Sequence, residues 1–170
     1  MPDSPPKIGA VADMLALSED LPEVELAPGD ILIQEGGHTD AIWVLVSGSL
    51  EIRKGDIVVN TISQPGALLG EVSVLLHSAS TATVAAVTTC RLRHAADGEA
   101  LLNSHPGITR VVAVGLAERL AFVTTYLADL KEQYADAPGM AMVSDVLREL
   151  TGRQAPAARS GSAREPNPEY

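Results

Sequence analysis

Between Val24 and His94 the chain is a succession of short β-type runs separated by turn residues. The expected strands are Val24 to Leu26, Ile31 to Gln34, Ile42 to Val46, Leu50 to Arg53, Ile57 to Ile62, Thr83 to Val87 and Cys90 to His94. They are separated by Pro28-Gly29, Gly36-Gly37, Ser47-Gly48, Gly55-Asp56 and Pro65-Gly66. Strands this short, bounded by turn residues at such regular intervals, predict an antiparallel sandwich or roll.

Helical patterns precede, interrupt and follow the strands. Apolar residues recur at roughly helical spacing from Lys7 to Leu17, and Glu71 to Leu76 can form one helical turn because it lacks turn residues. After Asp97 the apolar period lengthens from that of a strand to that of a helix. We therefore expect an α+β fold, in which an antiparallel β-roll or jelly roll (a double-stranded β-helix) carries a short N-terminal helix, a short central helix and a long C-terminal helix.

The length of 170 residues suits one well-buried domain with extensions. The expected parts are an N-terminal segment with a short helix over 1–23, the β-roll over 24–105, a long helix over 106–136, a short helix over 137–151 and a tail over 152–170. The tail contains no Val, Ile, Leu, Met or Phe, so we expect it to be disordered.

The long helix carries a seam of apolar residues in steps of three and four. The seam consists of Ala113, Leu116, Leu120, Val123, Leu127, Leu130 and Tyr134. It can be buried against the same helix of a second copy, giving a homodimer through residues 113–134, or against the chain's own β-roll. The strict seven-residue spacing favours the homodimer, because the apolar face of a globular helix is usually wider than a coiled-coil seam.

Composition excludes several classes of function. The net charge of −10, with no cluster of Lys and Arg, argues against contact with nucleic acid, and too few residues follow Gly139 for a DNA-binding winged helix. The single cysteine, Cys90, excludes an internal disulfide framework and indicates the reducing cytoplasm. Neither a secretory leader nor an uninterrupted apolar run of about 18 to 20 residues is present, so we expect neither secretion nor membrane insertion.

Nothing in the sequence favours an enzyme. A metal-dependent β-barrel enzyme needs two His and a carboxylate at one metal ion, whereas His38, Asp40, His77, His94 and His105 are scattered. No nucleophile, base and orienting group stand at a usable spacing, and the cysteine lies in a predicted strand as a buried thiol. We expect a non-enzymatic chain with no metal.

Roughly residues 24–137 resemble the cyclic-nucleotide-binding domain of bacterial cAMP-receptor-type regulators, of the regulatory subunits of cyclic-nucleotide-dependent kinases and of gated channels. The matching residues are Pro28-Gly29-Asp30, Ile31 to Gly36, Ile42 to Val46, Ser47 to Ile52, Gly66, Gly70-Glu71 and Ala82-Thr83-Val84. The resemblance implies a regulatory module whose ligand is cAMP, cGMP or a related anion, with no other cofactor.

The segment from Gly70 to Val84 resembles the family's phosphate-binding cassette, and we call it the cassette. In the family a Glu binds the ribose and an Arg binds the cyclic phosphate. Glu71 is present here, but Ser80 stands where the Arg is expected. The resemblance implies ligand contacts from Gly70, Glu71, Val72, Ser73, Ser80, Thr81 and Ala82, with Arg119 and Thr124 contributed by the long helix.

Each of these groups has an expected role. Glu71 would accept the ribose 2′-hydroxyl, and the N–H groups of Val72 and Ser73 at the start of the short helix would face the phosphate. The hydroxyl of Thr81 would touch the phosphate and can favour guanine. On the long helix, Arg119 would brace the carboxylate and Thr124 would offer a hydroxyl to the base.

The missing Arg leaves two hypotheses open. Removing one partner of a desolvated charge pair costs about 2 to 5 kcal/mol, or about 1.5 to nearly 4 decades in affinity. Either a protonated His77, Arg91, Arg93 or Arg119 compensates, and the chain senses a ligand under its C-terminal helix. Or the fold is degenerate, binds no nucleotide, and acts as a dimerisation or protein-interaction module.

Overall fold

The computed structural model describes residues 9–134 and 140–152, so the predicted disordered tail lies outside the described residues except for its first position. The chain divides into two compact units, one ending at Ala117 and the other beginning at Glu118. The division falls within the long helix. The cassette belongs entirely to the first unit, and the predicted ligand residues Arg119 and Thr124 belong to the second.

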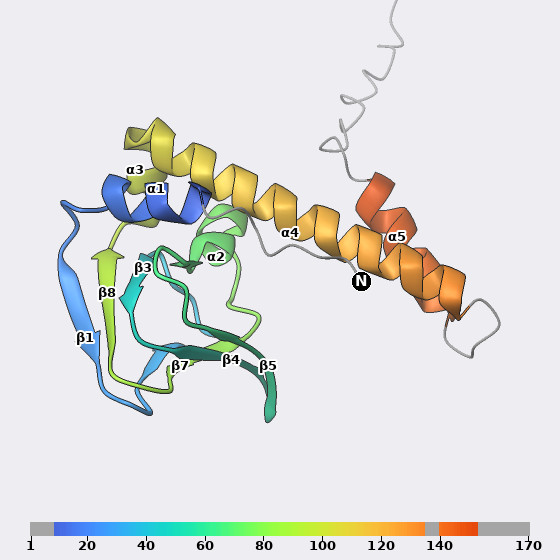
Figure 1. Cartoon of the computed structure of the whole chain (residues 1–170), viewed down its shortest axis with the longest axis horizontal. Helices are drawn as coiled ribbons and strands as arrows, with labels where there is room; N and C mark the ends of the chain where they lie inside the picture. The colour runs from blue at the N-terminus through green and yellow to red at the C-terminus, as the bar shows by residue number, and fades with distance from the viewer. Residues whose placement is uncertain (1–8, 135–139, 153–170) are drawn as a thin grey trace, which may run out of the picture. The chain divides into compact units, whose positions relative to one another are not determined.

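The described elements follow the predicted order (Figure 1). The strands are β1 (Glu23–Leu26), β2 (Ile31–Ile33), β3 (Ile42–Ser47), β4 (Leu50–Lys54), β5 (Ile57–Ile62), β6 (Leu68–Leu69), β7 (Thr83–Ala86) and β8 (Cys90–Ala95). The helices are α1 (Gly9–Leu17), α2 (Glu71–Leu76), α3 (Gly98–Ser104), α4 (Pro106–Gln133) and α5 (Met140–Gly152).

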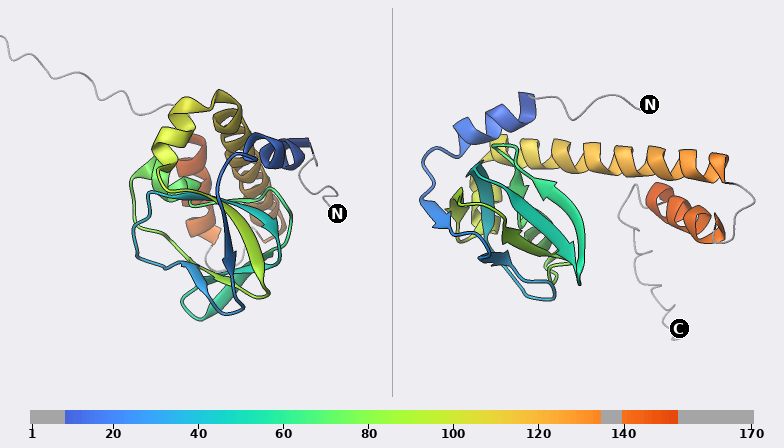
Figure 2. Two further views of the ribbon diagram at one scale, coloured as in Figure 1. Left: turned by 90° about the vertical axis from the view of Figure 1, so that its left-hand side faces the viewer. Right: turned by 60° about the horizontal axis from the view of Figure 1, so that its bottom comes forward.

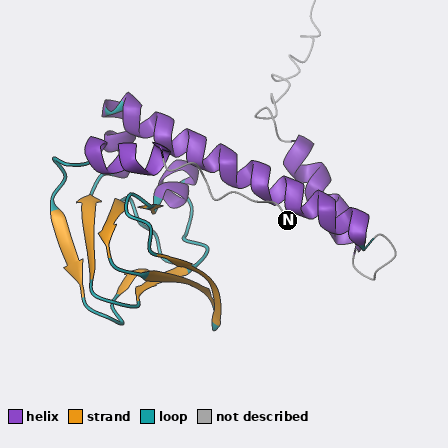
Figure 3. Cartoon of the chain, in the orientation of Figure 1, coloured by secondary structure: helices purple, strands orange, loops and turns teal. Residues whose placement is uncertain are grey.

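Two four-stranded antiparallel sheets form the roll, in the orders β1-β8-β3-β6 and β2-β7-β4-β5. The strands, orange in Figure 3, lie below α1, α2 and α3 in that view. The predicted α+β class with an antiparallel β-roll is therefore confirmed. β5 is an edge strand, and its residues Ile57, Val58 and Val59 are exposed.

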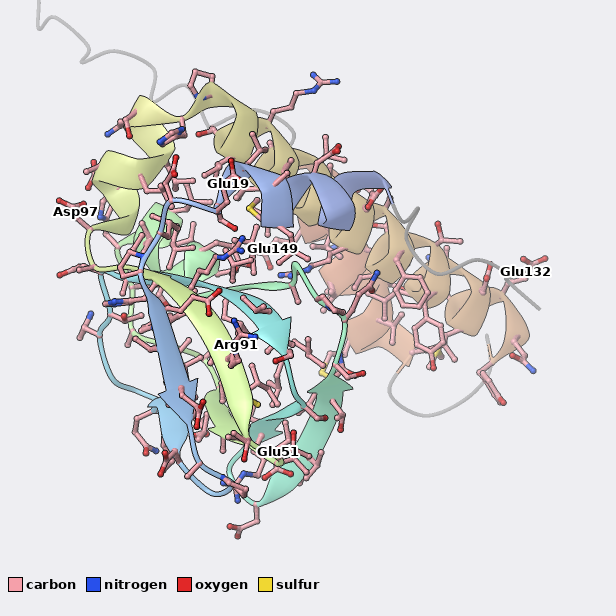
Figure 4. The ribbon with its side chains drawn as sticks, turned by 60° about the vertical axis from the view of Figure 1, so that its left-hand side comes forward. Glu19, Glu51, Arg91, Asp97, Glu132 and Glu149 are labelled. Atoms are coloured by element: carbon pink, nitrogen blue, oxygen red, sulfur yellow. The ribbon has the colours of Figure 1, made fainter. Side chains whose placement is uncertain are left out.

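Two described elements, β6 and α3, are not predicted from the sequence. β6 has only two residues, paired with Trp43 and Val44 of β3, which is too short for alternation to reveal. α3 begins at Gly98, where the sequence analysis extended the roll to residue 105. Its N-terminus is capped by the side chain of Asp97, which accepts a hydrogen bond of 2.8 Å from the Ala100 N–H (Figure 4).

Two apolar clusters hold the first unit together. One fills the space between the sheets and contains Ile33, Leu45, Leu50, Leu69, Val84, Ala86, Cys90 and Leu92. The other joins the helices to the roll and contains Met14, Ile42, Val44, Val74, Ala95, Leu101, Leu102, Ile108 and Val112. Cys90 is fully buried, as expected of a structural thiol. Figure 2 shows the sheets and their helices from two further sides.

Among the described helices, α4 is long and apolar enough to cross a membrane by length and composition alone. Its sequence contains no uninterrupted apolar run of that length, because charged residues such as Glu118 and Arg119 interrupt it. One such helix is weak evidence of a membrane span.

An ion-pair cluster fastens β1 to β8. Arg91 donates a hydrogen bond of 2.5 Å to Glu23, and Arg93 lies 3.5 Å from the other oxygen of the same carboxylate. Arg93 also donates to the carbonyl of Leu15 in α1, so the cluster joins the leading helix to the sheet. The hydrogen bond from Arg91 is the main reason that the pKa of Glu23 lies below its ordinary value of 4.5.

This pKa shift predicts an acid-labile contribution to stability. Because the pKa of Glu23 is lowered in the folded state, its stabilisation is present above pH 4.5 and is lost as the pH falls through the folded-state pKa. We expect the melting temperature of Glu23→Gln to fall less steeply with acidification than that of the wild type. Glu19→Gln, which removes an exposed carboxylate, is the matched control, and parallel curves for all three proteins would contradict the prediction.

Candidate functional site

The cassette begins at a turn that only glycine fits. Gly70 has φ 91°, in the left-handed region, and immediately precedes α2. A Cβ at this position would lie 2.4 Å from the Ala41 carbonyl oxygen and 3.1 Å from the Trp43 ring. The close contact with Ala41, just before β3, and with Trp43 in β3 therefore requires a glycine at the first position of the cassette.

Helix α2 spans Glu71–Leu76, as the sequence predicts. The side chain of Glu71 is buried, with 4% of its surface exposed, and Val74 on the same helix packs into the apolar cluster beside α1 and α3. Val72 is exposed. The residue after the helix, His77, has a left-handed backbone conformation, and its N–H donates to the carbonyls of Ser73 and Val74.

Ser80 occupies the position of the expected Arg and is buried. Its hydroxyl lies 3.1 Å from the hydroxyl of Ser73, which is also buried, so the two side chains form a hydrogen bond across the cassette. The Ser80 N–H donates to the Gly37 carbonyl at 2.8 Å, and its carbonyl accepts from the Gly36 N–H at 2.7 Å. The end of the cassette is thereby tied to the turn after β2.

Thr83 fastens the cassette to the same turn from β7. Its buried hydroxyl accepts hydrogen bonds from the Glu35 N–H at 3.0 Å and from the Gln34 side-chain amide at 3.3 Å. Between these two anchored residues, Thr81 is exposed and Ala82 is half-buried. The hydroxyl proposed to touch a phosphate thus belongs to the exposed part of the segment.

A cation from β4 also contacts the cassette. The Lys54 ammonium donates to the Thr81 carbonyl at 2.9 Å and lies 3.6 Å from the carboxylate of Glu35. The other oxygen of that carboxylate accepts from the Gly55 N–H at 2.8 Å. Lys54 is not predicted as a site residue from the sequence, because only the pairing of β4 with β7 brings it to this end of the cassette.

The structure brings Gly70, Glu71, Val72, Ser73, Ser80, Thr81 and Ala82 together as one continuous cassette of the first unit. Arg119 and Thr124 lie on α4 in the second unit, and the Thr124 hydroxyl donates to the Leu120 carbonyl at 2.8 Å. The ligand contacts of all nine residues stay predictions.

Three residues considered as substitutes for the missing Arg have other surroundings. Arg91 and Arg93 are engaged on β8 with Glu23. His77 borders a hollow beside α2 and α3 that is also lined by Asp40, Val74, Ala96, Asp97 and Glu99. The three carboxylates in that lining make it unsuitable for an anionic ligand. Across residues 9–134 and 140–152, no group of three or more His, Cys, Asp or Glu is arranged to hold a metal ion.

The cassette and the roll together match a known family. Residues 23–103 match the family model described as the cyclic nucleotide-binding domain. These residues belong to the cyclic nucleotide-binding domain family. The domain covers β1 to β8, the cassette and nearly all of α3, so the family resemblance inferred from the sequence is confirmed.

Two curated proteins are similar to part of this chain. The chain is 32% identical over 115 residues to the HTH-type transcriptional regulator Cmr of Mycobacterium tuberculosis, over 64% of this chain and 47% of that protein. It is 36% identical over 91 residues to the human voltage-gated delayed rectifier potassium channel KCNH5, over 51% of this chain and 9% of the channel. The chain thus spans less than half the length of either relative.

Solved structures share the fold at lower identity. PKAR CBD2 with bound Sp-2Cl-cAMPS matches with a TM-score of 0.55 and 21% identity, over 78% of this chain and 88% of that chain. The regulatory subunit of a cAMP-independent protein kinase A from Trypanosoma brucei matches with a TM-score of 0.53 and 21% identity, over 66% and 42% of the two chains. Both similarities concern the fold.

The glycine at the start of the cassette gives a stability prediction. Gly70→Ala should lower the free energy of unfolding by about 2 to 4 kcal/mol, since it adds left-handed backbone strain of about 1 to 2 kcal/mol to a backbone clash. Gly115→Ala is the control, because its Cβ would meet nothing within 4 Å on α4 and should be neutral or slightly stabilising. Urea denaturation of both variants measures the difference. Equal stabilities would show that the domain relaxes around Gly70.

Proposed function

We propose that the chain is a non-enzymatic regulatory module that binds cAMP, cGMP or a related anionic ligand at its cassette. The observation that supports this most directly is the conformation of the cassette, in which three features expected of the family are present. Gly70 starts α2 in the left-handed conformation, Glu71 is buried at the first turn, and Thr81 stays exposed beyond the anchored Ser80. A carboxylate for the ribose and a hydroxyl for the phosphate are thus retained in one continuous segment.

The proposed affinity is low. The Ser80 hydroxyl has no charge, and losing the cassette Arg is expected to weaken binding by about 1.5 to nearly 4 decades. The net charge of −10 also opposes the approach of an anion. We therefore expect a dissociation constant of roughly tens of micromolar or more, where a site that keeps its Arg would have one of about 1 micromolar.

One observation favours a second candidate, a nucleotide-free interaction module. The hydrogen bond between the buried hydroxyls of Ser73 and Ser80 satisfies both groups without a ligand. A cassette closed in this way keeps the fold while removing the reason to bind a phosphate. The similarity to a regulatory subunit of a cAMP-independent kinase is compatible with such a role.

We also propose a homodimer through the helix of residues 113–134. Along the predicted seam the exposed fractions are 48% for Leu120, 43% for Val123 and 49% for Tyr134, which is high for apolar side chains of a coiled-coil seam. A second copy of the helix would bury these residues. Leu116, at the start of the seam, packs against the apolar cluster of the first unit, so the proposed pairing concerns the seam from Leu120 onward.

The remaining assignments follow from composition. We propose a cytoplasmic module that does not itself contact nucleic acid or insert into a membrane, because it carries a net charge of −10 and a single buried cysteine. The role of transcriptional regulator belongs to the whole mycobacterial relative, of which this chain covers 47%.

A ligand titration tests the proposed site. In a thermal-shift titration with cAMP and cGMP, the wild type should gain melting temperature at millimolar ligand, and Ser80→Arg should do so at ligand concentrations at least tenfold lower. Ser80→Ala is the control, since it removes the Ser73 hydrogen bond without adding charge. If neither the wild type nor a folded Ser80→Arg variant responds to either nucleotide, the nucleotide-free module is the correct function.

Sedimentation equilibrium tests the dimer. The wild type should sediment as a dimer at micromolar concentration, and the double variant Leu120→Glu with Val123→Glu should be a monomer, because it places carboxylates in the proposed seam. Phe122→Glu is the control, as Phe122 is 64% exposed and lies outside the seam. A monomeric wild type would refute the dimer, and equal dissociation by the Phe122 variant would place the interface elsewhere on the helix.

A further inference from the structure

We propose that Lys54 is the cationic anchor of the cassette and takes over the charge that Ser80 does not supply. This inference rests on the proposed binding of an anionic ligand. It assigns a ligand contact to a residue outside the cassette, at the carboxyl end of β4.

Strand register brings Lys54 to the cassette. β4 and β7 run antiparallel with Arg53 opposite Thr83, so the end of β4 lies beside the residues that precede β7. The Lys54 ammonium then donates to the Thr81 carbonyl at 2.9 Å, across 27 residues of sequence. Thr81 directly follows Ser80, and the cation therefore contacts the residue next to the missing Arg.

The ammonium keeps capacity for an anion. A lysine ammonium has three N–H donors, and one of them is used by the Thr81 carbonyl. The Glu35 carboxylate lies 3.6 Å away, beyond a normal hydrogen bond, and its other oxygen already accepts from Gly55. The Lys54 side chain is 64% exposed, so a ligand can reach it.

Neighbouring arginines of the first unit are held elsewhere. Arg53, next to Lys54 on β4, lies 3.1 Å from the carboxylate of Glu51. Arg91 and Arg93 are engaged by Glu23 on the other sheet. A flexible lysine differs from these in that its ammonium can move to a phosphate oxygen without breaking a strong ion pair.

One phosphate can contact both Lys54 and Thr81. Bond lengths and angles place the hydroxyl and the carbonyl oxygen of the same threonine within about 5 Å of each other. An ammonium bonded to the Thr81 carbonyl therefore lies at most about 8 Å from the Thr81 hydroxyl, and movement of the flexible lysine side chain would bring it to an anion bound there. The pair would supply one charged and one neutral donor to the phosphate, where the family uses an Arg and a hydroxyl.

The test compares charged and uncharged ligands by NMR titration of the full ¹⁵N-labelled chain with cAMP and with adenosine. Lys54→Met should weaken cAMP binding about tenfold, as expected for one charge-assisted hydrogen bond at an exposed position, and should leave adenosine binding unchanged. Lys131→Met removes the same charge from an exposed position on α4 and should leave both affinities unchanged. Lys54→Arg should restore most of the affinity for cAMP.

A second comparison asks whether Lys54 replaces the Arg. In the Ser80→Arg background, the Lys54→Met change should weaken cAMP binding less than threefold, since the Arg then carries the phosphate charge. An undiminished tenfold loss in that background would overturn the replacement, because the two cations would act independently.

The outcomes separate this inference from the proposed function. If the wild type binds cAMP and Lys54→Met behaves like Lys131→Met, the role of Lys54 is refuted and the ligand site stands. If the wild type does not bind while Ser80→Arg does, Lys54 does not serve as an anchor and the natural cassette is degenerate. If neither protein binds cAMP or cGMP, the proposed ligand class itself fails.

Discussion

The burial of Val74 is the contact on which the arrangement of the first unit depends. This residue of α2 is 6% exposed and lies in one apolar cluster with Met14 of α1, Ile42 of β3, Leu101 of α3 and Ile108 of α4. A short helix of six residues has little stability of its own, so packing holds it. Any displacement of α2 must therefore be accommodated by the neighbouring helices, because close-packed cores transmit strain.

This packing also explains why the cassette keeps its shape with Ser80 at the position where the family has an Arg. The elements that shape it are the Gly70 turn, the Val74 contact and the backbone bonds of Ser80 to the turn after β2, none of which needs a ligand. The buried hydroxyls of Ser73 and Ser80 satisfy each other. The fold and the proposed ligand site thus depend on different residues, and similarity of fold carries little information about affinity.

Much of the fold could be predicted from the sequence, since glycine pairs and alternating runs report local geometry directly. α2 was predicted with its observed bounds, because Gly70 and the absence of turn residues from Glu71 to Leu76 mark it. β6 was not, because two residues show no alternation. The contact of Lys54 with Thr81 was missed for a different reason: it depends on the register of β4 against β7, which single-sequence patterns do not give.

The separation between the frame of the cassette and its exposed end has an evolutionary consequence. Gly70 and Val74 are constrained by packing whether or not a ligand binds, whereas Thr81 and Lys54 lie at the surface, where most substitutions change stability little. Selection for a stable fold therefore preserves the shape of the cassette whether or not a nucleotide is bound. Substitutions at a few surface positions can then lower, abolish or restore the affinity for a ligand while the domain stays folded.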